Sequence, residues 1–180
     1  CARRFVLRIR STAAEVAAFL AALPAAPHGD RLRIESAGTS HEGRDLQLVR
    51  CALPEQDERQ SLRVLVIANI HAGEIEGKEA VQVLAREIAH GQHEALLRRA
   101  VLWLLPIYNV DGNERIDAKN RPEQNGPDAV GERANAQGLD LIRAASVAQK
   151  WGIDLAEVAR IWKGGCIIRA LFLDTIRKAY

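Results

Sequence analysis

Residues 62–70, with the sequence LRVLVIANI, decide how the rest of the chain is interpreted. This continuous run of Val, Ile and Leu is typical of a β-strand buried on both faces. The pattern then predicts a helix over 75–89, a short helix over 94–99 and a second apolar strand over 101–106. A strand, a helix and a strand in this order predict a βαβ unit, and hence a parallel sheet covered by helices.

The sequence on the N-terminal side predicts a larger sheet. Three segments alternate apolar and polar residues as half-buried strands do, and Thr12 precedes an Ala- and Leu-rich helix over 13–23. The three segments are 5–9, 32–36 and 45–51. On the other side, the polar residues 109–138 predict a long loop, of a kind that is usually functional or disordered, and the pattern is purely helical from Leu141 onward. The fold class is therefore α/β.

Composition excludes several classes of function. No apolar run reaches the ~18 residues that a membrane-spanning helix needs. The net charge is only +2 and basic residues are interspersed with acidic ones, which argues against a nucleic-acid partner. The three cysteines, Cys1, Cys51 and Cys166, are widely spaced and predict neither a disulfide framework nor a cysteine metal site. Nothing in the sequence indicates a compartment.

A candidate metal site follows the first buried strand. His71 and Glu74 stand just beyond its carboxyl end, where open α/β sheets place ligands, and Gly73 between them permits a tight turn. An imidazole and a carboxylate suit zinc, and a catalytic zinc has three protein ligands and a water. His-x-x-Glu alone is a weak motif, because the same pair is common in solvated helix caps.

Four segments in one order make the motif specific: 40–44 (SHEGR), 71–74 (HAGE), 106–114 (PIYNVDGNE) and 137–141 (QGLDL). Together they resemble the zinc metallocarboxypeptidase family, the carboxypeptidase A-like peptidases, over about residues 5–143. The resemblance implies a mostly parallel or mixed sheet with flanking helices. It also implies zinc as cofactor, peptide or protein C-termini as partners, and removal of C-terminal amino acids as the reaction.

The resemblance assigns roles to individual residues. His71 and Glu74 match the first two zinc ligands, and Asp140 matches a carboxylate that steadies the ligand histidine. Arg143 matches an arginine that grips the substrate's terminal carboxylate. Arg121 or Arg133 matches the arginine that polarises the scissile carbonyl, and spacing does not choose between them. A solvated loop charge is the alternative for each arginine.

Two departures predict that the site is incomplete. Ile142 stands where the family has an asparagine that helps to bind the carboxylate. The third zinc ligand is a downstream histidine in the family, followed by a general-base glutamate, yet no histidine here follows residue 93. His90 and His93 are expected at a polar helix end. We therefore expect weak zinc binding and little or no peptidase activity.

Residues 161–170 (IWKGGCIIRA) followed by 172–174 (FLD) resemble a different family, the decarboxylating phosphogluconate dehydrogenases, in their helical domain. Arg169 matches an arginine that contacts the substrate phosphate there, and a solvated Arg169 on a packed helix is the alternative. NADP-dependent chemistry is not expected, because no strand leads into a G-x-G-x-x-G turn.

The chain therefore resembles a chimera with a seam near residues 140–145. This seam predicts a truncated carboxypeptidase-like domain over 1–142 and a short all-α segment over 143–180. Truncation is expected to leave a strand with the sequence of a buried strand at the edge of the sheet. Two other functions stay open, a fragment of phosphogluconate dehydrogenase and a non-catalytic module that binds peptide carboxylates. Association through the C-terminal helices is a further option.

Overall fold

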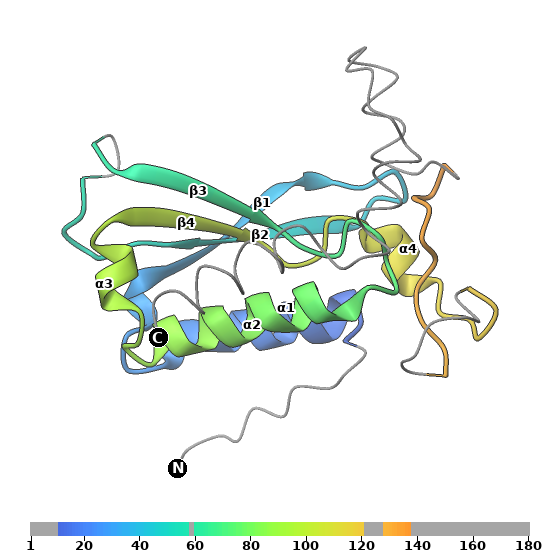
Figure 1. Ribbon diagram of the computed structural model, residues 1–180, viewed down its shortest axis with the longest axis horizontal. Helices are drawn as coiled ribbons and strands as arrows, with labels where there is room; N and C mark the ends of the chain where they lie inside the picture. Colours follow the sequence, from blue (N-terminus) through green and yellow to red (C-terminus); the bar gives the residue numbers. More distant parts are fainter. Residues whose placement is uncertain (1–10, 58–59, 121–127, 138–180) are drawn as a thin grey trace, which may run out of the picture. The chain divides into compact units, whose positions relative to one another are not determined.

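The structure is a computed structural model that describes residues 11–57, 60–120 and 128–137 (Figure 1). All of these belong to the first of two units into which the chain divides, Cys1–Asp140. The strand expected over 5–9 and the helical segment over 143–180 lie outside the described residues. The domain boundary at residue 142 stays a prediction.

The described sheet is mixed and has four strands in the order β1-β2-β4-β3. The strands are β1 (Leu32–Thr39), β2 (Asp45–Cys51), β3 (Leu62–Ile67) and β4 (Ala100–Leu105). β3 and β4 are parallel, whereas β2 is antiparallel to both of its neighbours, β1 and β4. These strands confirm the α/β class and the predicted βαβ unit.

The helices are α1 (Ala13–Ala22), α2 (Ile75–Ala89), α3 (Glu94–Leu97) and α4 (Val110–Glu114), with 3-10 turns at Leu23–Ala25 and Gly29–Arg31. Thr12 caps α1 as predicted: its hydroxyl accepts from the Glu15 amide at 3.2 Å, and the Glu15 carboxylate accepts from the Thr12 amide at 2.9 Å. Within the described residues, no helix is long and apolar enough to cross a membrane.

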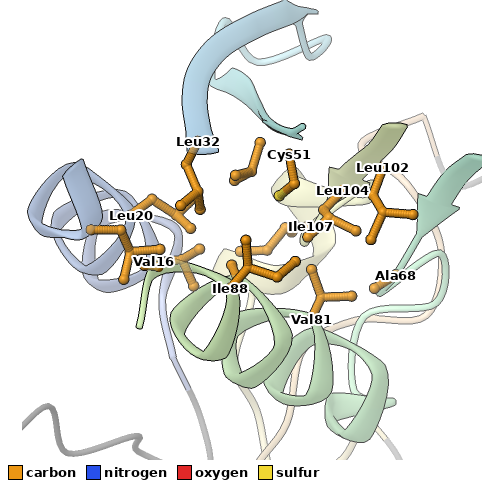
Figure 2. Close-up of a cluster of buried hydrophobic side chains, with 14 of the residues drawn as sticks. Val16, Leu20, Leu32, Cys51, Ala68, Val81, Ile88, Leu102, Leu104 and Ile107 are labelled. Atoms are coloured by element: carbon orange, nitrogen blue, oxygen red, sulfur yellow. The ribbon is translucent and has the colours of Figure 1, made fainter. Parts of the chain in front are cut away.

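The core lies between the sheet and the two longer helices, α1 and α2, which cover the same face of the sheet (Figure 1). Figure 2 shows Val16 of α1 and Val81 and Ile88 of α2 pointing toward Leu102 and Leu104 of β4. Each of these side chains is buried. β4 is one of the two inner strands of the described sheet, between β2 and β3.

The expectation that residues 62–70 form a strand buried on both faces was wrong. β3 lies at an edge of the described sheet and exposes three large side chains: Leu62 at 65%, Leu65 at 55% and Ile67 at 40%. Only the face that carries Val64 and Val66 packs against the core. The apolar run indicates a strand, but whether its second face is covered depends on packing partners far away in the sequence. The edge position itself agrees with the expectation.

Candidate metal site

His71 and Glu74 are brought together by the turn that joins β3 to α2. The backbone turns at Asn69 and Gly73, where φ is +53° and +98°, and the Glu74 amide donates to the His71 carbonyl at 3.1 Å. The His71 side chain is fully buried, and that of Glu74 is 32% exposed. His71 Nδ1 lies 3.5 Å from Glu74 Oε1, so both side chains converge on one place.

This separation fits the donor set of a zinc ion. Two ligand atoms at about 2.1 Å from a tetrahedral zinc lie about 3.4 Å apart. The observed distance between Nδ1 and Oε1 is close to that value. The exposed part of Glu74 leaves the pair open to solvent on one side, as an ion site with exchangeable ligands requires. The pair is therefore chemically and geometrically suited to hold two of the positions around zinc.

A third protein ligand is not found in the part of the chain that the structure describes. No group of three or more His, Cys, Asp or Glu side chains there is placed to hold a metal ion. His90 caps the C-terminus of α2, the opposite end of the helix from Glu74, and His93 Nε2 lies 2.7 Å from Glu87 Oε2. Both histidines therefore occupy the polar helix end that was predicted, a 15-residue helix away from His71.

Arg133 is the one predicted substrate-binding arginine that falls in the described residues. The two candidate zinc ligands, His71 and Glu74, are called the metal pair below, and Arg133 lies beside Glu74 of this pair. Its Nη1 is 3.6 Å from Glu74 Oε1, and its side chain is 46% exposed. The other predicted site residues, Arg121, Asp140, Arg143 and Arg169, are outside the described residues. Their roles stay predictions.

A polar network anchors the turn 40–44 to α4 beside the site. The Asp111 carboxylate is buried and accepts from Ser40 Oγ at 2.7 Å, from Arg44 Nη1 at 2.7 Å and from the Glu42 amide at 3.3 Å. Burial raises the pKa of Asp111, but these hydrogen bonds lower it by more, so the pKa lies below its usual 3.8. The matched motifs SHEGR and VDGNE are thus joined in space.

Replacing Asp111 by Asn is expected to lower the free energy of unfolding at pH 7 by about 2–3 kcal/mol, because the Asn amide cannot accept all three bonds. Since the folded pKa is depressed, the carboxylate's contribution is complete above the unfolded pKa and is lost as the pH falls below about 4. Urea unfolding at pH 7 and at pH 3 checks this: the gap between the two proteins should shrink at pH 3.

The exposed Asp117, whose carboxylate accepts a local bond from the Lys119 amide at 2.7 Å, is the control. Asp117→Asn is expected to change stability by less than about 0.5 kcal/mol. A gap for Asp111→Asn that is as large at pH 3 as at pH 7 would contradict the assigned role of the carboxylate.

Sequence reasoning missed two asparagines that hold the site together. Asn69 and Asn109 are both buried and follow the carboxyl ends of the parallel strands β3 and β4. Asn69 Nδ2 donates to the Glu74 carbonyl at 3.2 Å, and Asn109 Nδ2 donates to the Arg133 carbonyl at 3.1 Å. An Asn within four residues of the end of each of two apolar strands was the available signal, since such residues often bond to nearby backbone.

Comparison with known proteins relates this site to one family. The sequence profile described as zinc carboxypeptidase matches residues 16–159. The metallo-carboxypeptidase from Burkholderia cenocepacia is 25% identical with a TM-score of 0.54, over 73% of this chain and 32% of that one. The metallo-carboxypeptidase from Pseudomonas aeruginosa is 25% identical with a TM-score of 0.51, over 74% and 31%. This chain spans about a third of the length of either structure.

A second similarity covers 45 residues, a quarter of the chain. The decarboxylating 6-phosphogluconate dehydrogenase 1 of Spinacia oleracea is 69% identical over this segment, and dehydrogenase 2 of Arabidopsis thaliana is 67% identical. The segment spans 9% of the length of either dehydrogenase. The chain therefore joins similarities to two unrelated families, as a chimera does, although the zinc carboxypeptidase match continues past the predicted boundary at residue 142.

Proposed function

This chain belongs to the zinc carboxypeptidase family, and from that premise we propose that it binds zinc weakly through His71 and Glu74 and is an incomplete carboxypeptidase. The observation that supports the proposal most directly is the 3.5 Å separation between His71 Nδ1 and Glu74 Oε1. A neutral imidazole and a carboxylate are ligands that zinc prefers. A bound zinc would supply a Lewis acid that polarises a carbonyl and activates a water.

Arg133 is the proposed carbonyl-binding residue of this site. A guanidinium beside Glu74 lies within reach of a group bound at the metal pair, and its fork of N–H donors suits a carbonyl or carboxylate oxygen. This contact supports Arg133 for the role that spacing left open between Arg121 and Arg133; Arg121 lies outside the described residues. Arg143 stays the proposed partner of the peptide's terminal carboxylate. The Pseudomonas aeruginosa metallo-carboxypeptidase was solved in complex with (2-guanidinoethylmercapto)succinic acid, a ligand that carries carboxyl groups.

The positions of the histidines support catalytic incompleteness, because none lies beyond residue 93, in the part of the chain where the family has its third zinc ligand. The five histidines are His28, His41, His71, His90 and His93. A resident catalytic zinc needs three protein ligands, and two such ligands give a site that exchanges its metal readily. Peptide and protein C-termini remain the proposed partners, bound more readily than they are cleaved.

The dehydrogenase alternative is less well supported. Its 45-residue similarity is high, but NADP-dependent hydride transfer needs a dinucleotide site, and the 180 residues contain no G-x-G-x-x-G turn after a strand. The alternative of a non-catalytic module for peptide carboxylates uses the same arginines as the main proposal. It differs in one measurable respect, since such a module needs no zinc.

The test is the zinc content of the purified chain after chelation and reconstitution. We expect wild type to bind up to one zinc with low affinity and His71→Ala to lose it, whereas His90→Ala, at the far end of α2, keeps it. Equal zinc content in wild type and His71→Ala would contradict the proposed site. A tight zinc, lost in His71→Ala, would mean that a third ligand completes the site.

Peptide assays separate the remaining alternatives. Zinc-loaded protein is expected to release little or no C-terminal amino acid, and robust trimming abolished by His71→Ala would contradict the proposed incompleteness. Binding of peptides with free but not amidated C-termini, unchanged by chelation, would instead favour the non-catalytic module.

A further inference from the structure

The amide of Asn109 uses all of its hydrogen-bonding groups to hold backbone. Its Nδ2 donates to the Arg133 carbonyl at 3.1 Å and to the Ala134 carbonyl at 3.0 Å, while its Oδ1 accepts from the Gly112 amide at 3.1 Å. The residue is 3% exposed. A buried amide with three bonds in fixed directions has no freedom to turn, so it defines the position of the carbonyls that it holds.

Close backbone packing restricts the same segment. A Cβ atom placed on Gly112 would lie 2.5 Å from the Glu132 carbonyl oxygen and 2.7 Å from that of Ala134. The Glu132 amide also donates to the Gly112 carbonyl at 2.8 Å. The backbone at 132–134 therefore lies close against Gly112 of α4, and the Asn109 side chain lies at the same contact.

A continuous set of hydrogen bonds connects Arg133 to Glu74 through the two asparagines. The backbone amide of Asn109 donates to the backbone carbonyl of Asn69 at 3.1 Å, and Asn69 Nδ2 donates to the Glu74 carbonyl at 3.2 Å. The two backbone segments that carry Arg133 and Glu74 are thus each held by an asparagine, and the asparagines are bonded to each other. Their side chains meet at the 3.6 Å contact between Nη1 and Oε1.

We propose that Asn109 is a positioning residue, which holds the backbone at Arg133 and thereby keeps the guanidinium beside the metal pair. Its role toward zinc rests on the proposed function, but its grip on Arg133 does not. Asn109 acts through Arg133, since its side-chain hydrogen bonds go to the backbone of Gly112, Arg133 and Ala134. The role differs from ordinary helix capping, because the cap uses Oδ1 alone, whereas Nδ2 serves the Arg133 segment.

The grip can be measured without zinc, by trypsin cleavage of the metal-free protein. Trypsin attacks the peptide bond after an arginine, and the carbonyl at Arg133 is one that Asn109 holds. Asn109→Asp keeps the acceptor for the Gly112 amide but turns an oxygen toward two carbonyl oxygens. We expect cleavage after Arg133 to rise about tenfold, with cleavage after Arg50, within β2, unchanged.

Asn120 provides a matched reciprocal control. Its Nδ2 donates to the Arg115 carbonyl at 2.7 Å and to the Val130 carbonyl at 2.8 Å. Asn120→Asp is therefore expected to raise cleavage after Arg115 and not after Arg133. The proposal is overturned if Asn109→Asp leaves cleavage at Arg133 unchanged. If Asn109→Asp raises cleavage at every site, Asn109→Ser is the deciding variant, because its hydroxyl keeps an acceptor for the helix cap but does not reach Arg133. With Asn109→Ser, a rise in cleavage after Arg133 alone supports the proposal. A rise in cleavage at every site overturns it.

Zinc affinity then tests the consequence at the metal pair. Removing the cation beside Glu74 is expected to tighten zinc binding by about two- to fivefold in Arg133→Gln. Asn109→Asp should also tighten zinc binding. The variant that carries both substitutions should bind zinc with the affinity of the stronger single variant. Effects that add would overturn the action through Arg133. Absence of zinc from wild type would refute the proposed function. The trypsin cleavage after Arg133 would then be the test of whether Asn109 holds the Arg133 backbone.

Discussion

Replacing Lys78 by Ala is expected to lower the free energy of unfolding by about 3–5 kcal/mol. Lys78 lies on α2 one turn after Glu74 and is only 2% exposed, which makes it one of the largest fully buried side chains among the described residues. Its Nζ donates to the Ser11 carbonyl at 2.6 Å and to Asn113 Oδ1 at 2.8 Å. The change to Ala leaves a cavity and removes one donor from each of two acceptors, although the Ser11 carbonyl keeps a bond from Asn113 Nδ2 at 3.3 Å.

Lys78→Met separates the cavity from the charge. Methionine keeps most of the volume, so we expect a cost of about 1–2 kcal/mol, mainly from the lost bond to Asn113. Denaturant unfolding of both variants against wild type measures the two effects. Equal costs for Met and Ala would show that the ammonium group, and not the filled volume, dominates.

Burial of Lys78 also predicts a dependence on pH. Desolvation lowers the pKa of the Lys78 ammonium below its usual 10.5, although nearby glutamates oppose the shift. The unfolded chain then binds more protons than the folded one between the two pKa values. Stability should therefore rise with pH through that window in wild type relative to Lys78→Met. A stability difference that is constant up to pH 10.5 would contradict a depressed pKa.

Replacing Gly131 by Val is expected to lower stability by about 3 kcal/mol and to displace Arg133 from Glu74. A Cβ on Gly131 would lie 2.6 Å from the Gly112 carbonyl oxygen and 2.9 Å from the Ala72 Cβ. Both neighbours are held by the tight packing between α4 and the His71 turn. The backbone before Arg133 must move away to make room, and zinc binding should change with it.

Gly77→Ala is the contrasting control. A Cβ on Gly77 meets the Ala68 Cβ at 3.5 Å, an ordinary contact, and Gly77 lies inside α2. Alanine should therefore stabilise the protein by about 0.5–1 kcal/mol through helix propensity. Thermal unfolding and zinc titration of both variants provide the comparison. A Gly131→Val protein as stable as wild type would show that the 131–134 segment is not packed as described.

Local sequence patterns were sufficient to predict most elements of the described fold. The bounds of β2 and α2 follow from alternation and periodicity alone, and Thr12 with Glu15 marks the start of α1. Prediction failed for the five-residue helix α4, because Asn, Gly and Asp are typical of loops and the local cap signal, Asn109 Oδ1 accepting from the Gly112 amide, was not used. It also failed for the outer face of β3, since an apolar run does not say which neighbours cover it.

The sequence by itself determined which chemical groups are available: a histidine and a glutamate that suit zinc, a polar loop that carries arginines, and a 45-residue segment similar to a second family. These are properties of residue types and short spacings, which are local in the chain. Only the tertiary structure decided which residues meet. The parallel pairing of β3 and β4 sets Asn69 beside Asn109, and the packing of residues 131–134 against Gly112 and Asn109 sets Arg133 beside Glu74. Such contacts join segments 40 to 60 residues apart in sequence, and they depend on strand order and close backbone packing that no local pattern encodes.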